Sequence, residues 1–345
     1  MEVQQIKIMK KIIILLSFLI IGIVFASVSA IIIPSPYTYT IFQNSTAVYA
    51  VNGKTGNIDY WNTDPAIVIQ SAGLANYPNF GSIFITCGTY NLKSMPQTYG
   101  SSSIQGCGEG QTILKRAFNG TYLHTISMNP SYNGLNGYAV LKDITIDGNY
   151  GHVDNLQDEV SIAGNGYEEN VEVKNFNAIG QQLCGNILLN NPKIIGVNSS
   201  TSGSTMGIWS CPNSRVSIIG QGDFENMRVP AILASGDLEI STGSYFSHNH
   251  IQSAGTGGGQ IAVGKSAIIT GIVITNGGGS ATSGIELNNG TYNISNVQIT
   301  GEKACAIVSN GQQSIIQVSN SNLKGNTQAI CQNGLSMWYL SNNIP

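Results

Sequence analysis

The stretch that decides the fold is IELNNGTYNISNVQITG, residues 285–301. It holds three short segments in which apolar and polar residues alternate, at 285–287, 292–294 and 297–299, and polar turns rich in Asn, Ser and Gly separate them. Alternation over a few residues is typical of a β-strand that buries one side. The stretch therefore predicts three short strands joined by tight turns.

The same unit recurs through the C-terminal half of the chain. Its first apolar segments begin at residues 187, 208, 232, 261, 285, 307 and 330, with spacings of 21, 24, 29, 24, 22 and 23 residues. Three strands and three turns in about 22 to 28 residues make one coil of a parallel β-helix, whose strands pair with the coils on either side. Similar units at 140–149 and 171–176 extend the coil toward the N-terminus. The alternative is an antiparallel sandwich, which the same alternation permits.

The composition agrees with an all-β protein that has a polar but uncharged surface. Only 10% of the 345 residues are charged, against about 25% in an ordinary soluble domain, whereas 42% are hydrophobic and 41 residues are Gly. This balance excludes a disordered chain and a helical bundle. With 15 basic and 18 acidic side chains, the net charge of −3 gives no electrostatic footprint for nucleic acid, so no such partner is expected.

Residues 1–30 predict export. Three lysines precede the apolar segment 12–25, and small residues at 28–30 resemble a signal-peptidase site. The alternative is an uncleaved anchor, because the apolar residues 31–33 lengthen the run to about the 20 residues that span a bilayer. In both cases the lysines hold the N-terminus inside, so the predicted location is secreted or cell-surface, with membrane contact only through this segment.

The N-terminal part carries a more specific order of motifs. Asp64 and Pro65 form a helix start and Gly73 a stop; the strand 80–86 then leads into Cys87-Gly88-Thr89-Tyr90, and Gly106-Cys107-Gly108 follows. This order resembles the opening of the pectate lyase superfamily. The resemblance implies a single-stranded right-handed parallel β-helix with a short N-terminal capping helix. We assign residues 31–50 to an N-terminal extension and residues 51–345 to the β-helix.

Six cysteines in an exported chain indicate disulfides. Cys87 stands where the resembled family usually has Pro, and Cys107 falls in the next motif, about one coil later, so the resemblance implies a bond between them. Cys305 and Cys331 differ by three positions within the repeat, which a turn can absorb. Cys184 and Cys211 differ by six, or about 20 Å along a strand, beyond the ~7 Å limit between Cα atoms unless a turn folds back.

Acidic residues gather between 142 and 174, which hold eight of the 18 in the chain. A carboxylate pair serves glycoside hydrolysis, and lyase chemistry needs a base together with a cation such as calcium. The alternative is a solvated loop that keeps a neutral surface soluble. The candidate catalytic acids are Asp147, Asp154, Asp158 and Glu159, the last three also being candidate calcium ligands, and the candidate substrate-binding residues are Tyr150, His152 and Tyr167.

A second candidate site uses the stacking of successive coils. Glu225 and Arg228 occupy one turn, and His248 and His250 occupy the equivalent turn one coil later. Arg228-Val229-Pro230 is similar to the Arg-x-Pro motif of pectate lyases, whose Arg abstracts a proton. We therefore add Arg228 and His248 as candidate catalytic residues and His250 as a candidate substrate-binding residue.

The superfamily contains lyases, hydrolases, epimerases and non-catalytic adhesins, so the fold does not select a function. The predicted function is polysaccharide cleavage by lyase or hydrolase chemistry, with a polysaccharide or cell-surface glycan as partner. The alternative is a non-catalytic β-helix that binds glycan, mediates adhesion or builds a surface layer. An uncovered strand edge at the C-terminal coil also predicts self-association.

Overall fold

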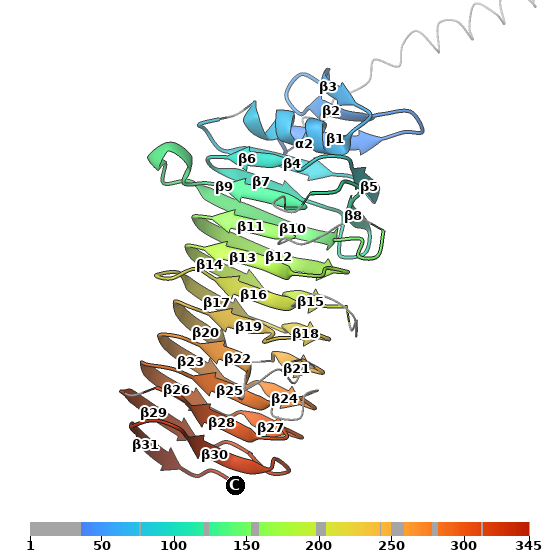
Figure 1. Cartoon of the computed structure of the whole chain (residues 1–345). Helices are drawn as coiled ribbons and strands as arrows, with labels where there is room; N and C mark the ends of the chain where they lie inside the picture. The colour runs from blue at the N-terminus through green and yellow to red at the C-terminus, as the bar shows by residue number, and fades with distance from the viewer. Residues whose placement is uncertain are drawn as a thin grey trace, which may run out of the picture.

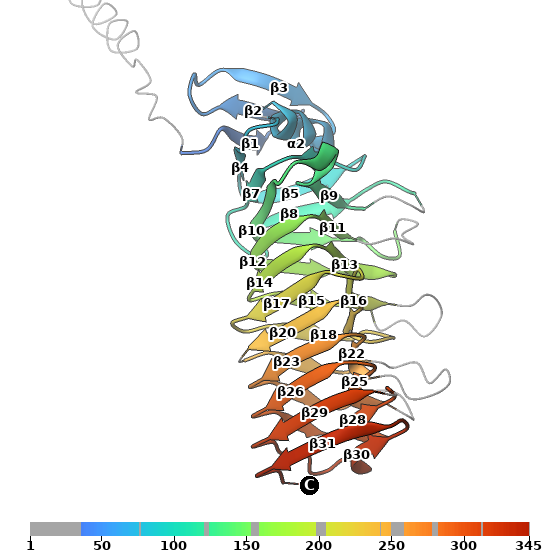
Figure 2. The same ribbon diagram turned by 90° about the vertical axis from the view of Figure 1, so that its left-hand side faces the viewer.

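The computed structural model of this chain describes residues 36–75, 77–120, 124–152, 159–197, 205–241, 243–249, 259–277, 282–311 and 313–344. Its strands wind around one axis and form three long parallel faces (Figures 1 and 2). Strands of successive coils pair in parallel, as β25 (Ser283–Leu287) does with β28 (Cys305–Ser309). The predicted parallel β-helix is therefore confirmed, and the antiparallel sandwich is wrong.

One strand from each coil lies on each face. The first face contains β6 (Gln97–Tyr99), β9 (Ile126–Asn129), β11 (Val160–Ala163), β13 (Ile179–Cys184), β16 (Met206–Ser210), β19 (Ile232–Ala234), β22 (Gly259–Val263), β25, β28 and β30 (Gln328–Gln332). The second face contains β4 (Gly81–Ile85), β7 (Ser102–Gln105), the first halves of β10 (Tyr138–Asp147) and β12 (Asn165–Lys174), β14 (Asn186–Asn190), β17 (Arg215–Ile219), β20 (Asp237–Ser241), β23 (Ser266–Thr270), β26 (Thr291–Ser295), β29 (Ser314–Ser319) and β31 (Ser336–Ser341). The third face contains β5 (Gly88–Leu92), β8 (Thr112–Arg116), the second halves of β10 and β12, β15 (Lys193–Ile195), β18 (Asp223–Glu225), β21 (Tyr245–Ser247), β24 (Val273–Thr275) and β27 (Gln298–Thr300).

A cap closes the N-terminal end of the coil (Figure 1). The strands β1 (Tyr39–Gln43), β2 (Val48–Asn52) and β3 (Ile58–Asn62) form an antiparallel meander, and β1 also pairs in parallel with β4. Part of the predicted extension 31–50 thus joins the sheet. The helix α2 (Pro65–Leu74) begins where the sequence predicts, because Asp64 Oδ1 accepts the Ala66 amide at 3.0 Å.

The Asp64 carboxylate also ties the helix to the first coil. Its Oδ1 accepts the backbone amide of Lys93 at 2.9 Å, and its Oδ2 accepts the hydroxyl of Ser94 at 2.6 Å. One buried side chain therefore starts the capping helix and fixes its position on the solenoid.

The sharp bend between the second and third faces is held by stacked polar residues. Asp143, Asn170 and Asn191 occupy equivalent positions in three coils, with φ values of 51°, 52° and 52°, a region that Asn and Asp tolerate better than most residues. Asn170 Nδ2 donates to Asp143 Oδ1 at 2.8 Å, and Asn191 Nδ2 donates to Asn170 Oδ1 at 3.1 Å. This ladder explains why Asn is common in a chain that has few charges.

Three disulfides cross between coils. Cys87–Cys107 and Cys305–Cys331 have Cα atoms 5.3 and 5.9 Å apart, so both predicted pairs are confirmed. The prediction against Cys184–Cys211 is wrong, because their Cα atoms are 4.9 Å apart. The repeat starting at 187 lies on β14 of the second face, whereas the repeat at 208 lies on β16 of the first, so their offsets were measured from different faces.

The interior is apolar, with a few large polar exceptions. Phe224 and Phe246 of neighbouring coils stack inside it at 4.6 Å between ring centroids. Glu168 also points inward and accepts a hydrogen bond from Gln181 at 2.6 Å, and Glu302 accepts one from Gln260 at 2.6 Å. Burial raises the pKa of Glu168 and of Glu302 to about 7.

Candidate functional site

The acidic residues of the 142–174 segment diverge in space. Asp147 ends β10 on the third face, where its Oδ1 accepts the Asn149 amide at 2.8 Å and Asn175 Nδ2 at 3.0 Å. Glu168 faces the core, whereas Glu169 points outward on the second face and pairs with Lys142 at 2.6 Å. The described acids therefore lie on different surfaces, because alternation along β12 sends consecutive residues to opposite sides.

Glu159 lies at the corner that leads into β11. It is fully buried and accepts a hydrogen bond from the Thr125 hydroxyl. Asp154 and Asp158 lie outside the described residues, so the predicted calcium site, which joins them to Glu159, stays a prediction. Within the described ranges, no group of three or more His, Cys, Asp or Glu side chains is arranged to hold a metal ion.

The predicted substrate-binding residues do not share one surface. Tyr167 lies on the second face with its ring 5.0 Å from Lys142 Nζ. Tyr150 and His152 lie in the turn after the third face, where the Tyr150 amide donates to Asn175 O at 2.9 Å and the His152 amide donates to Asn149 O at 3.1 Å. Tyr167 and this turn therefore lie on different faces among the described residues, and the substrate-binding roles stay predictions.

His248 and Arg228 lie in turns of neighbouring coils, but their positions are not equivalent. Glu225 pairs with Ser247, so the residue stacked on His248 is Asn226, and both have left-handed φ values of 52° and 61°. Arg228 comes two residues after Asn226, and His250 lies outside the described residues. The Arg228 amide donates to Thr205 O at 3.0 Å. The catalytic roles of Arg228 and His248 stay predictions.

The structure brings forward a different carboxylate pair, on β18 of the third face (Figure 1). Phe224 points into the core, so Asp223 and Glu225 on either side of it both point outward. At about 3.3 Å rise per residue, their Cα atoms lie roughly 6.6 Å apart. The sequence signal is the Asp-Phe-Glu alternation, which the search for a dense acidic segment missed.

Asp223 lies between Lys193 of the preceding coil and Tyr245 of the following coil. Burial raises the pKa of the Asp223 carboxyl, and the nearby charge of Glu225 raises it further. Lys193 opposes this rise, but its ammonium group is held by Glu109 at 2.7 Å and Glu172 at 3.0 Å. Asp223 Oδ1 is buried and has no hydrogen-bond partner in the described part of the chain.

Glu225 has a more polar environment. The Ser247 hydroxyl donates to Glu225 Oε1 at 3.4 Å, and His248 Nδ1 lies 3.3 Å from the same hydroxyl. The exposed ring of Tyr245 lies beside Asp223, and its hydroxyl is 3.1 Å from Thr275 Oγ1. The site thus combines a carboxyl group with a raised pKa, a second carboxyl group that accepts a hydrogen bond, and an exposed aromatic ring.

Comparisons with known proteins add the following. No protein-family model matches the sequence, and no curated protein matches it. Three solved structures are similar at 12% identity: the A-module of a mannuronan C-5 epimerase from Azotobacter vinelandii, an alginate lyase from Paenibacillus sp. and a GH87 α-1,3-glucanase from Streptomyces thermodiastaticus. They cover 81%, 79% and 82% of this chain and 95%, 97% and 66% of their own, with TM-scores of 0.48, 0.48 and 0.37. The three parallel faces and the capping helix give this chain the right-handed parallel β-helix fold that its resemblance to the pectate lyase superfamily implies.

Proposed function

We propose that this protein hydrolyses a polysaccharide on its third face, with Asp223 and Glu225 as the two carboxyl groups. The observation that carries this proposal is their pairing on one strand, where the pKa of Asp223 is raised and Glu225 is hydrogen-bonded. Glycosidases use two carboxyl groups about 5 to 9.5 Å apart, one of which donates a proton, and a raised pKa suits that role. Their Cα atoms lie roughly 6.6 Å apart on the same side of one strand, so side-chain rotation can bring the two carboxyl groups within that range.

The roles follow from the environments. In the proposed roles, Asp223 is the general acid and donates a proton to the glycosidic oxygen as the bond to the leaving sugar breaks. Glu225 either removes a proton from the water that attacks the anomeric carbon, or attacks that carbon itself to form an intermediate that water then hydrolyses. The apolar face of Tyr245 supports a sugar ring beside Asp223.

The proposed setting is outside the cell. Three disulfides are typical of an oxidising compartment, and polysaccharides are extracellular substrates. Export depends on residues 1–30, which lie outside the described residues. The described part of the chain contains no helix that is both long and apolar enough to cross a bilayer.

The test is product analysis on neutral and acidic polysaccharides. Hydrolysis releases new reducing ends without the ultraviolet absorbance of an unsaturated uronate, whereas lyase chemistry produces both. Lyase products would contradict the proposed roles, and no product from any substrate would favour the non-catalytic alternative. Repeating the assay with calcium and with a chelator tests the predicted calcium site.

Variants then test the assigned residues. Asp223→Asn and Glu225→Gln each remove one carboxyl group, and we expect each to lower the rate by about 10³-fold. The matched control is Asp59→Asn in the cap, because an amide oxygen can still accept the bonds that Asp59 Oδ2 receives from Tyr39 and Asn52. Wild-type rates in both site variants would exclude this pair.

A further inference from the structure

Three cavities follow one another along the outer side of the second face. The first has a volume of about 300 Å³ and extends from Tyr138 to Ser217, and the second, of about 350 Å³, extends from Arg215 to Thr291. The third, of about 550 Å³, begins at Asn293 and reaches β31. Arg215 lines the first two cavities, and β26 lines the second and third. The three cavities lie in a row over the strands from β10 to β31, which Figure 2 shows stacked along the solenoid axis, and we call this row the groove.

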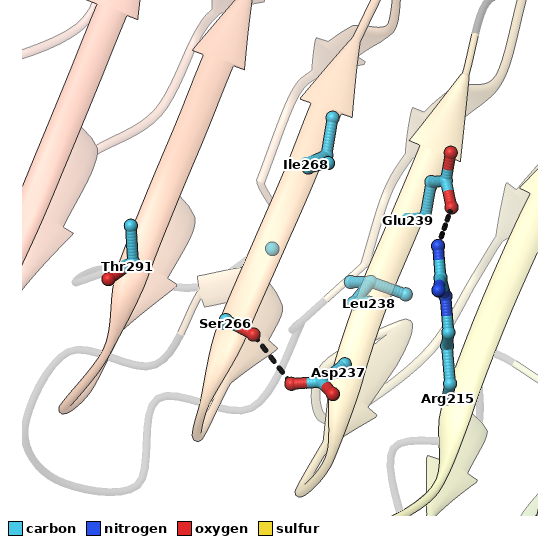
Figure 3. A pocket seen from close by; sticks show the side chains of 8 residues that line it. Arg215, Asp237, Leu238, Glu239, Ser266, Ile268 and Thr291 are labelled. Carbon is cyan, nitrogen blue, oxygen red and sulfur yellow. Dashed lines mark hydrogen bonds and ion pairs between the residues drawn. The ribbon is translucent and has the colours of Figure 1, made fainter.

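The charged side chains of this groove neutralise one another. Figure 3 shows the guanidinium group of Arg215 directed at Glu239, with Nη2 2.7 Å from Oε2. Asp237 is paired with Lys265 at 3.5 Å and accepts the Ser266 hydroxyl at 2.5 Å. A ligand with strong net charge therefore finds no uncompensated partner among these groups, which favours a neutral ligand.

Apolar contacts are spaced along the groove between short hydrogen-bonding side chains. Ile268 is 51% exposed at its centre (Figure 3), Tyr138 is 42% exposed at one end, and Tyr339 is 56% exposed at the other. Thr291 and Asn293 are among the hydroxyl and amide groups between them. Aromatic and apolar surfaces for sugar faces, next to amides and hydroxyls for sugar hydroxyls, are the pattern that a carbohydrate needs.

The spacing of the coils fits a polymer. Equivalent side chains repeat every ~4.8 Å along the axis, which is close to the length of one sugar unit in an extended chain. We propose that this groove binds a neutral polysaccharide laid along the solenoid axis, at a site separate from Asp223 and Glu225 on the adjacent face. Such a groove would hold the polymer on the protein whether or not the third face cleaves it.

The test is affinity electrophoresis of the intact chain in gels that contain a soluble β-glucan, xyloglucan or galactomannan, with polygalacturonate as the anionic comparison. We expect at least one neutral polymer to retard the protein, with little dependence on salt because no ion pair to the ligand forms. Ile268→Glu places an unpaired charge in the groove and should weaken binding about tenfold.

The matched control is Ile58→Glu on the N-terminal cap, because Ile58 has nearly the same exposure, 52%. Ile268→Ser removes the apolar contact without adding charge, so it should weaken binding less than Ile268→Glu does. It also keeps the test possible if Ile268→Glu disturbs folding. Wild-type retardation in both Ile268 variants, no retardation by any neutral polymer, or stronger retardation by polygalacturonate would each overturn the proposal. Loss of activity in Asp223→Asn with retardation intact would separate the two sites.

Discussion

The sequences Asp223-Phe224-Glu225 on β18 and Asp237-Leu238-Glu239 on β20 follow the same pattern on adjoining coils. In each, the middle residue is buried and the two acids point outward. On β20 both acids have cationic partners, Lys265 and Arg215, whereas on β18 the nearest cation, Lys193, is held by two other acids. Burial and the charge of Glu225 raise the pKa of Asp223, and the nearby Lys193 opposes this rise without cancelling it.

The difference shows that strand alternation places a carboxyl group on the surface, whereas side chains of the neighbouring coils determine whether its charge is compensated. Arg215 is the register partner of Asp237 and reaches Glu239 on the same strand. Lys193 occupies the corresponding position beside Asp223, but its ammonium group is held by Glu109 and Glu172. In the following coil Tyr245 is the register partner of Asp223 and brings no second cation.

The largest effect should come from introducing a cation that compensates the charge of Asp223. Tyr245→Arg places a guanidinium group beside Asp223, so the pKa of that carboxyl should fall and Asp223 should become a poorer proton donor. We expect the rate to drop by about 10³-fold and to recover partly in acid. Tyr245→Phe adds no charge, so its rate–pH curve should keep the wild-type position. A rate–pH curve for Tyr245→Arg that matches wild type would contradict the acid role of Asp223.

The next prediction compares the stability effects of two consecutive residues of β12, Glu168 in the core and Glu169 on the outer side of the second face. The pKa of Glu168 is about 7 in the folded protein, above its unfolded value, so its contribution to stability is complete below about pH 4.5 and is lost as pH rises toward 7. Relative to wild type, Glu168→Gln should therefore gain about 3 kcal/mol in unfolding free energy between about pH 4 and pH 8.

Glu169 provides the control with the opposite sign. Its hydrogen bond to Lys142 lowers the pKa of the Glu169 carboxyl, so it stabilises the fold above the unfolded pKa and less so in acid. Glu169→Gln should therefore lose stability relative to wild type as pH rises. Urea unfolding at both pH values measures the two differences, and equal signs would contradict the assignment of Glu168 to the core.

The smallest effect compares Asp223 and Asp237 directly. Asp223→Asn removes a carboxyl group that is costly to ionise, so thermal unfolding at neutral pH should shift upward. Asp237→Asn removes an exposed ion pair, which should lower the unfolding free energy by at most about 1 kcal/mol. Shifts in the same direction for both variants would mean that Asp223 is compensated in solution.

Local patterns were sufficient to predict the coil, the capping helix at Asp64 and the Cys305–Cys331 disulfide, whereas the family resemblance implied Cys87–Cys107. The third disulfide was rejected because the segment at 187 was compared with segments of another face. The acidic cluster at 142–174 was also misleading, since β10 and β12 each pass from one face to the next and send neighbouring acids to the core, the second face and the third face.

The sequence alone determined which side chains are buried and how long each coil is, because strand alternation and turn residues are local properties. Only the tertiary structure decided which residues stack between coils, because loops of different length change the register from one coil to the next. Lys193 and Tyr245 are 30 and 22 residues from Asp223, yet they lie directly beside it. The pKa of Asp223, and with it the proposed site, depends on those neighbours.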